Sequence, residues 1–362
     1  MKQNKPSARP FSAGTRRGAA QKPEEERATH RPWHHLPGGQ FRNPAGSPVR
    51  SQAPVKCTLP FFARMVRQSF DKVEVPEGHV IPRPLAHRAL SDHMVKQGDF
   101  LTWLGHASFL LRLNGKVILT DPYLTRYAGP AGLGPKRYVK SGIAIGDLPP
   151  VDYLVVSHNH YDHLDERALA RLPGKERMTV IVPLRLGEFF TARGFKNVVE
   201  LDWHDAYDAD GLTITALPVV HWSRRSGFDT NRTLWAGFSF KAERHHVFFG
   251  GDSAYGPVFE EIGKAYGPFD TALIGIGAYE PRVMMAASHA NPEEAVAIGR
   301  DIGAKRLVGM HWGTVVLTAE PPFEPPERFM KAGRERGYTN HDLWIMAIGE
   351  TRDLSDPWPA NT

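Results

Sequence analysis

The chain has 362 residues, of which 45 are lysine or arginine and 39 are aspartate or glutamate, for a formal net charge of +6. Its single cysteine, Cys57, excludes intrachain disulfides and thiolate metal sites and is typical of a protein of the reducing cytoplasm. The sequence holds neither a run of eighteen apolar residues nor an apolar stretch near its start. We therefore expect no transmembrane helix and no ordinary signal peptide.

The first predicted unit, residues 1–50, is a basic leader rich in proline, glycine, serine and arginine. It holds ten lysines and arginines against three acidic residues, whereas the rest of the chain is nearly neutral. We expect this leader to be disordered or draped over the body. Its charge is compatible with peripheral binding to the inner face of an anionic membrane, and equally with a solubilising role. The neutral body argues against a nucleic-acid partner.

A histidine-rich stretch, His30 to His35, lies within this leader. Imidazoles in such number are typical of metal clusters, but the proline in this stretch leaves the side chains without a rigid scaffold. We therefore interpret the stretch as a surface loop.

Residues 51–98 are predicted to form an N-terminal extension with an amphipathic helix over 59–70. The apolar stripe of this helix consists of Phe62, Met65, Val66 and Phe70. An interfacial membrane helix would show such a stripe. The stripe is more typical of a helix that packs on its own core or on a second copy of the chain, so a homodimer is one predicted assembly.

Residues 99–350 are predicted as the compact catalytic domain and 351–362 as a C-terminal tail. Near the start of the domain, Asn114-Gly115 lies between two apolar, β-rich runs and predicts a two-residue hairpin turn. Strands and helices then alternate, with turn signals between them, to the end of the domain. This alternation predicts an α/β layered fold.

The chemistry of the domain centres on the run from Ser157 to Asp165. It follows a short buried-strand pattern at residues 153–156 and precedes a helix pattern that Asp165 caps. Four of its side chains are metal-ligand types: His158, His160, Asp162 and His163. They cannot all reach one ion without strain. The spacing therefore predicts two ions, the first two histidines on one and the aspartate with the last histidine on the other.

Three further β-rich runs also end in a ligand-type residue. These residues are His221, Asp252 and His311. In an α/β sheet, ligands bind in the crevice outside the carboxyl ends of the strands. Because four strand ends agree with one pattern, the sequence predicts that they meet at a single metal centre.

Residues 288–296 predict the start of a helix, with Asn291 as the N-cap and Pro292 as the first helical residue. His289 lies just ahead of this N-terminus, where backbone N–H groups favour anions. We interpret His289 as a residue that hydrogen-bonds a phosphate, with a capping or packing role as the alternative.

The run from His158 to His163 resembles the signature of the metallo-β-lactamase superfamily of binuclear metallohydrolases. Longer segments are similar to one family within it, the N-acyl-phosphatidylethanolamine-hydrolysing phospholipase D family and its bacterial relatives. The most specific segments are HWSRR at residues 221–225, GAYEPR at 277–282 and MHWGT at 310–314. The resemblance implies an α/β fold of the four-layer αβ/βα sandwich type.

The resemblance also implies a ligand set for two Zn²⁺ ions, and such nitrogen and oxygen ligands accept iron or manganese as well. The implied ligands of the first ion are His158, His160 and His221. Those of the second ion are Asp162, His163 and His311. Asp252 would bridge both ions, and two such ions lower the pKa of a shared water toward about 7.

The implied activity is the hydrolysis of N-acyl-phosphatidylethanolamine-type glycerophospholipids to N-acylethanolamine and phosphatidic acid, by a cytoplasmic enzyme that associates peripherally with membrane. Asp162 and Asp252 would be catalytic as metal ligands, and His289 would handle the phosphate. Tyr279 and Arg224, in two of the specific segments, are predicted as further substrate contacts.

Two other functions remain open on the sequence alone. A sugar-phosphate lactonase, or another hydrolase of this fold, would use the same centre on a different bond. A catalytically weak lipid- or partner-binding protein would keep the metals without turnover.

Two segments depart from the family pattern. Ser253 stands where the family pattern has threonine, and residues 283–287 differ from the animal-type pattern. The sequence therefore does not choose the acyl chain or the headgroup.

Overall fold

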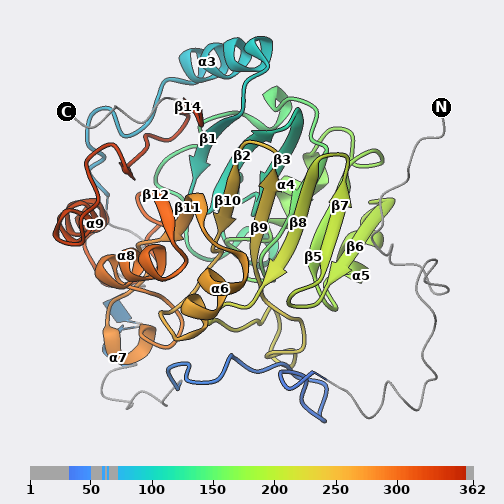
Figure 1. The fold of residues 1–362 in the computed structure, drawn as a ribbon, viewed down its shortest axis with the longest axis vertical. Coiled ribbons are helices and arrows are strands. Elements are labelled where there is room, and N and C mark those ends of the chain that lie inside the picture. Colours follow the sequence, from blue (N-terminus) through green and yellow to red (C-terminus); the bar gives the residue numbers. More distant parts are fainter. Residues whose placement is uncertain (1–31, 50–58, 62, 65–71, 356–362) are drawn as a thin grey trace.

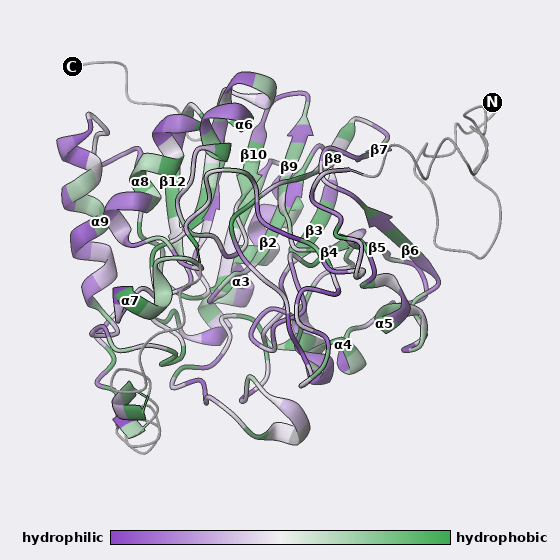
Figure 2. Ribbon diagram, turned by 90° about the horizontal axis from the view of Figure 1, so that it is seen from below, coloured by the Kyte–Doolittle hydropathy of each residue, from purple (hydrophilic) through white to green (hydrophobic). Residues whose placement is uncertain are grey.

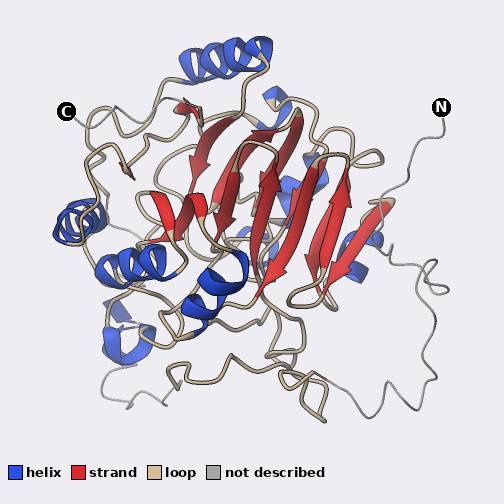
Figure 3. Cartoon of the chain, viewed as in Figure 1, coloured by secondary structure: helices blue, strands red, loops and turns tan. Residues whose placement is uncertain are grey.

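The computed structural model describes residues 32–49, 59–61, 63–64 and 72–355. Their strands form two seven-stranded sheets, which pack against each other with helices on their outer sides (Figure 1). Secondary structure alternates along the chain much as the sequence predicts, and Figure 3 shows the helices outside the two groups of strands.

The first sheet has the strand order β14-β1-β2-β3-β4-β5-β6. Strand β3 pairs antiparallel with β2 and parallel with β4, so the sheet is mixed. Strands β2 and β3 form the predicted hairpin, and Asn114 and Gly115 have φ values of 48° and 77°, as a type I′ turn requires. The strands are β1 (Phe100–Gly105), β2 (Ser108–Leu113), β3 (Lys116–Thr120), β4 (Tyr153–Val155), β5 (Thr179–Pro183), β6 (Asn197–Leu201) and β14 (Thr351–Asp353).

The second sheet has the strand order β13-β12-β11-β10-β9-β8-β7. Its half from β10 to β13 is parallel and its half from β7 to β10 is antiparallel. The parallel strands are nearly continuous apolar runs because both of their faces are covered. The strands are β7 (Ala206–Ala209), β8 (Leu212–Leu217), β9 (Gly237–Ala242), β10 (His246–Phe249), β11 (Phe269–Gly275), β12 (Ala304–Met310) and β13 (Leu343–Trp344).

Helices complete the outer layers on both sides. Helices α3 (Arg83–Lys96), α4 (Glu166–Arg171) and α5 (Gly187–Thr191) share a hydrophobic core with the outer face of the first sheet. Helices α6 (Val258–Tyr266), α8 (Pro292–Asp301) and α9 (Glu324–Glu335) pack on the second sheet, in a core that continues between the sheets. The predicted αβ/βα sandwich is therefore confirmed. In Figure 2 hydrophobic residues concentrate along the strands, whereas α9 is mainly hydrophilic.

We call residues 32–49 the strap. It runs along one side of the domain, below the sheets in Figure 1. Phe41 of the strap is 1% exposed, and its N–H donates to the Asn231 carbonyl over 2.8 Å. The strap therefore packs on the body, while the remaining residues of the predicted leader lie outside the described ones.

The two other predicted boundaries have different outcomes. Of the helix predicted over 59–70, the structure describes residues 59–61 and 63–64, which are helical, and the four residues of its apolar stripe lie outside the described residues. At the other end of the chain, β14 pairs antiparallel with β1. The prediction of a tail from residue 351 is therefore wrong for residues 351–353, which extend the sheet. Among the described residues, no helix is both long and apolar enough to span a membrane.

Leu154 tests how much the core beneath the site stabilises the domain. It lies in β4, is fully buried and precedes the metal-ligand run. Leu154→Ala should lower the free energy of unfolding by about 2–5 kcal/mol, because it removes buried methyl groups and leaves a cavity. Val95→Ala on α3, where the side chain is 81% exposed, should change it by about 0.5 kcal/mol or less. Equal effects in chemical denaturation would contradict the packing described here.

Candidate metal centre

The run from Ser157 to Asp165 forms the loop between β4 and α4, as the sequence predicts. One Asp165 oxygen accepts the N–H groups of Arg167 and Ala168, which makes Asp165 the N-cap of α4. Its other oxygen accepts the N–H groups of Leu124 and Thr125. This one carboxylate fixes the end of the loop to the helix and to the chain after β3.

The structure brings all seven predicted ligands together, in two clusters of four side chains. The first cluster consists of His158, His160, His221 and Asp252. The second consists of His106, Asp162, His163 and His311. Their ligand atoms lie within 4.8 Å of one another in each cluster, and all eight residues follow the carboxyl ends of strands, four of them in the loop after β4.

Asp252 lies between the two clusters. Its Oδ2 atom is 3.0 Å from Nε2 of His163 and 3.8 Å from Nε2 of His221, and its Oδ1 atom is 3.2 Å from Nε2 of His311. Gly251 before it has φ +54°, and a Cβ there would lie 2.7 Å from the Ser157 side chain. The glycine thus permits the close approach that brings Asp252 into contact with both clusters, which is the position that a bridging ligand requires.

The first cluster contains three imidazole nitrogens that face one another. Nδ1 of His160 lies 2.8 Å from Nε2 of His158 and 3.2 Å from Nε2 of His221. The other nitrogen of His221, Nδ1, donates to the Ser288 carbonyl. Nδ1 of His158 donates to the Ser157 hydroxyl. The Nε2 atoms of His158 and His221 therefore carry lone pairs that are directed at the same point. A cation stabilises such an arrangement.

Several atoms of the site are buried and have no hydrogen-bond partner. They are Nε2 of His160, Nε2 of His163, both ring nitrogens of His311 and Oδ1 of Asp252. Buried polar atoms are nearly always hydrogen-bonded, so a group of unpartnered ones needs another explanation. Coordination of metal ions would satisfy Nε2 of His163, Nε2 of His311 and Oδ1 of Asp252, which face one another, and these residue types are those that zinc, iron and manganese accept.

Burial keeps the imidazoles of the first cluster neutral. It lowers the pKa of His158 and of His221 well below the usual value and brings the pKa of His160 to about 4. The same cause lowers the pKa of His289, which lies beside this cluster, to about 4. Neutral imidazole is the form that binds a metal.

The carboxylates of the site are ionised. Burial raises the pKa of Asp162 and Asp252, but the facing imidazoles, His163 first among them, lower it further, and the pKa of each stays well below its usual value. The carboxylates act in turn on two histidines. Burial lowers the pKa of His163 and of His311. The effect of Asp252 and Asp162 is larger, so the pKa of His163 stays well above its usual value and that of His311 is raised to about 9. Metal ions would displace these protons.

Asp121 supports the centre from the end of β3, a role that the sequence analysis missed. It is fully buried, and its Oδ2 atom accepts from Nδ1 of His163 over 2.7 Å and from the Ser157 hydroxyl over 2.6 Å. Through that hydroxyl it also orients His158. An outer carboxylate of this kind fixes the tautomer and raises the basicity of a ligand histidine. Its position directly after an apolar strand was the available signal.

His106 was also missed. It follows β1, and its Nε2 atom donates to Oδ2 of Asp162 over 3.0 Å. Its ring lies 3.9 Å from the ring of His311, between centroids. His106 thus holds the Asp162 carboxylate through the same oxygen that faces His163. The signal was a single histidine after a strand, without the neighbouring ligands that identify the central run.

The predicted substrate contacts have different outcomes. Arg224 is exposed and lies over Trp222, whose ring contacts His160, and its role as a substrate contact stays a prediction. Tyr279 is fully buried and its hydroxyl donates to Glu324 of α9, so the structure corrects its prediction as a substrate contact. The Tyr279 ring packs under Arg328 and supports the loop between β11 and the residues that follow it.

Arg225, the neighbour of Arg224, has a structural role that the sequence did not indicate. Its guanidinium donates to the carbonyls of Asn159 and Leu164, one inside and one near the end of the metal-ligand loop. The guanidinium also lies 4.1 Å from the Tyr161 ring. These contacts stabilise the loop in the conformation that presents the ligands.

His289 lies at the edge of the centre, between α7 (Arg282–Met285) and α8. Its Nδ1 atom is 3.9 Å from Oδ2 of Asp252, and its side chain is 16% exposed. Asn291 caps α8 in a capping box with Glu294, and Pro292 is the first helical residue, so the predicted helix start is confirmed. The His289 carbonyl accepts from Arg282, which also pairs with Glu294.

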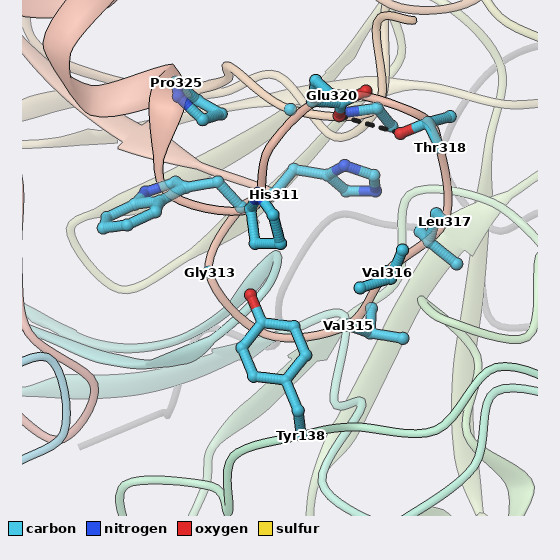
Figure 4. A pocket seen from close by; sticks show the side chains of 13 residues that line it. Tyr138, His311, Gly313, Val315, Val316, Leu317, Thr318, Glu320 and Pro325 are labelled. Carbon is cyan, nitrogen blue, oxygen red and sulfur yellow. Dashed lines mark hydrogen bonds between the residues drawn. The ribbon is translucent and has the colours of Figure 1, made fainter. Parts of the chain in front are cut away.

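A small pocket lies beside His311, along the loop that follows β12 (Figure 4). The Glu320 carboxylate borders it and accepts from the Thr318 hydroxyl and from the backbone N–H groups of Ala278 and Glu280. The pocket holds about 20 Å³, room for one water-sized group.

The strap reaches the centre through Asn43. Its side-chain oxygen accepts from the backbone N–H of His221 and from the indole N–H of Trp235. A segment far from the ligands in sequence thus fixes the backbone of one ligand. Asn43 has no ligand-type side chain, so the spacing of ligand-type residues in the sequence does not identify it.

Comparison with known proteins places the chain among metal-dependent hydrolases. A family model described as a beta-lactamase superfamily domain matches residues 116–312. A Caenorhabditis elegans relative, named N-acyl-phosphatidylethanolamine-hydrolyzing phospholipase D 1, is 38% identical over 291 residues, 77% of this chain and 80% of the relative. A Rubrobacter xylanophilus relative, named a metal-dependent hydrolase, is 31% identical over 262 residues, 70% of this chain and 96% of the relative.

Solved structures share the fold. The isothiocyanate hydrolase from Delia radicum gut bacteria aligns with a TM-score of 0.56 and 20% identity, over 70% of this chain and 98% of that one. At this identity the likeness shows the fold alone.

Asn43→Ala should weaken metal retention by about 10- to 100-fold, the usual effect of removing a contact that supports a ligand. The change leaves the buried His221 N–H without its partner, so the His221 ring is held less firmly. Competition with a chelator measures the affinity. Gln40→Ala removes another strap contact, to the Thr230 carbonyl, and should leave metal retention unchanged. Equal metal loss in both variants would show that the strap acts as a whole and not through Asn43.

Proposed function

The chain belongs to the metallo-β-lactamase superfamily and, within it, to the N-acyl-phosphatidylethanolamine-hydrolysing phospholipase D family, and from this premise we propose that it cleaves N-acyl-phosphatidylethanolamine-type lipids. It is a metal-dependent hydrolase. In the proposed reaction a water oxygen bonds to phosphorus as the bond from phosphorus to the ethanolamine oxygen breaks. The N-acylethanolamine leaves with a proton, and phosphatidic acid remains.

The observation that carries this proposal is the pair of ligand clusters joined by Asp252. We assign His158, His160 and His221 to one Zn²⁺ ion and Asp162, His163 and His311 to the other, with Asp252 shared. Two such ions supply electrostatic stabilisation of a phosphoryl group and lower the pKa of water, which is the chemistry that phosphodiester hydrolysis needs. The nitrogen and oxygen ligands also fit iron or manganese.

The chain's own residues hold the ligands in place and present a donor to the substrate. Asp121 and His106 orient His163 and Asp162 from outside the ligand set. His289 is neutral because burial lowers its pKa, so its ring N–H can donate to a phosphoryl oxygen at the edge of the site. Arg282 and the capped start of α8 fix the backbone of His289 and thereby the direction of that donor.

The lipid partner, peripheral binding to a membrane face through the basic leader, and a homodimer stay predictions. The exposed Arg224 is the cation nearest in sequence to the ligand His221, and we assign it to the phosphate side of the substrate. The relative from C. elegans supports a lipid substrate by its name alone, so product analysis decides the reaction.

Asp252→Asn should remove nearly all turnover and most of the metal of the paired site. The change replaces a charged oxygen ligand that faces both clusters by a neutral amide. Elemental analysis of freshly purified protein measures the metal, and the loss should approach two ions per chain. Asp147→Asn, an exposed aspartate in the 3₁₀ turn at Ile145–Asp147, is the matched control and should keep both metal and activity. Full metal content in the Asp252→Asn variant would contradict the assignment of Asp252 as the bridging ligand.

His289→Ala should leave the metals bound and lower turnover by about 10²–10³-fold, the usual cost of losing one donor to developing charge. Mass spectrometry of the products from a synthetic N-acyl-phosphatidylethanolamine measures both rate and bond cleaved. His87→Ala on the exposed side of α3 is the control and should be fully active. Diacylglycerol as product would place cleavage on the other side of phosphorus. Turnover of lactones alone would assign the centre to a lactonase.

A further inference from the structure

A third cluster of metal-ligand side chains joins the strap to the body. Nε2 of His34 lies 2.7 Å from Oδ1 of Asp202, and Nε2 of His35 lies 2.8 Å from Oδ2 of the same carboxylate. The interpretation of residues 30–35 as a surface loop is therefore wrong for His34, which is 4% exposed. The cluster shares no residue with the paired clusters around Asp252.

The backbone directs both imidazoles to the same side. Neighbouring side chains point to opposite faces of an extended chain. Here a turn closed by the hydrogen bond from the His35 N–H to the Pro32 carbonyl places the two rings 4.5 Å apart, between centroids. Both Nε2 atoms then meet one carboxylate 168 residues further along the chain. The two adjacent histidines thus converge on one carboxylate.

The surroundings of the cluster are aromatic. The His34 ring stacks on Trp203 at 4.4 Å, and Trp33 and Phe41 contact the two imidazoles. Oδ1 of Asp202 accepts the Trp203 N–H as well, which fixes the direction of the carboxylate. A polar centre inside an apolar shell, with its carboxylate oriented by a backbone donor, is the environment typical of a protein metal site.

The protonation states agree with metal binding. Burial is the main cause that lowers the pKa of His35, which favours the neutral imidazole. Burial raises the pKa of Asp202, but the two histidines lower it further, and the carboxylate stays ionised. Two imidazoles and one carboxylate form a common ligand set for zinc and its first-row neighbours, with water in the remaining position.

We propose that His34, His35 and Asp202 bind one zinc-class divalent cation, which fastens the strap to the chain after β6. This site is structural, and its existence does not depend on the reaction proposed above. Because the strap also carries Asn43 to the backbone of His221, the ion would stabilise a contact of the paired centre without being part of it.

The first test is diffraction from crystals of the full chain grown with zinc. An anomalous difference map at the zinc edge should show a peak about 2.0–2.2 Å from both Nε2 atoms and from a carboxylate oxygen of Asp202. If the map shows no peak there while the paired site is occupied, the cluster is only a pair of hydrogen bonds and the proposal is overturned. This measurement uses the unaltered protein, so it does not depend on whether a variant folds.

The second test is zinc content by elemental analysis. The double variant His34→Gln/His35→Gln should lose one zinc per chain relative to the unaltered protein. His204→Gln is the matched control, because His204 lies two residues from Asp202 but pairs with the Tyr266 hydroxyl, and it should lose none. Unchanged zinc in a folded double variant would overturn the proposal. Asp252→Asn, in contrast, should empty the paired site and keep the anomalous peak at His34, so failures of the two assignments can be told apart.

Discussion

Imidazole nitrogens face one another at the centre of this protein, and the surrounding structure holds them there. Nε2 of His158, Nδ1 of His160 and Nε2 of His221 converge, and the Asp252 carboxylate lies between them and the second cluster. A cation placed among these groups would be coordinated by the imidazole nitrogens and by the carboxylate together. Neighbouring hydrogen bonds orient these atoms.

The orientation of the ligand imidazoles depends on hydrogen bonds to residues outside the ligand set. Asp121 holds His163 directly and His158 through the Ser157 hydroxyl, and the Ser288 carbonyl holds His221. Each of these bonds uses the nitrogen that is not directed at the centre, so it selects the tautomer as well as the orientation. His289 also lies outside the ligand set. The capped start of α8 places it beside Asp252.

The strap adds a second level of support. It is joined to the body by His34 and His35 on Asp202, by Phe41 in the core and by Asn43 on the backbone of His221. A segment that the sequence presents as an irregular leader is thus coupled to a ligand of the candidate metal centre. Changes in how the strap is held can reach the centre through one hydrogen bond, without any movement of the sheets.

The sequence by itself determined the features that depend on neighbours in the chain. The spacing from His158 to His163, the ligand-type residues His221, Asp252 and His311 after apolar runs, and the Asn291 cap all follow from local patterns, which a strand end or a helix start imposes on nearby residues. Only the tertiary structure decided that His106, Asp121 and Arg225 support the ligands and that Tyr279 turns away toward Glu324. It also decided that His34 and His35 meet Asp202. These contacts join residues up to 168 positions apart. Their geometry is set by how the layers pack, and no local pattern of residues encodes it.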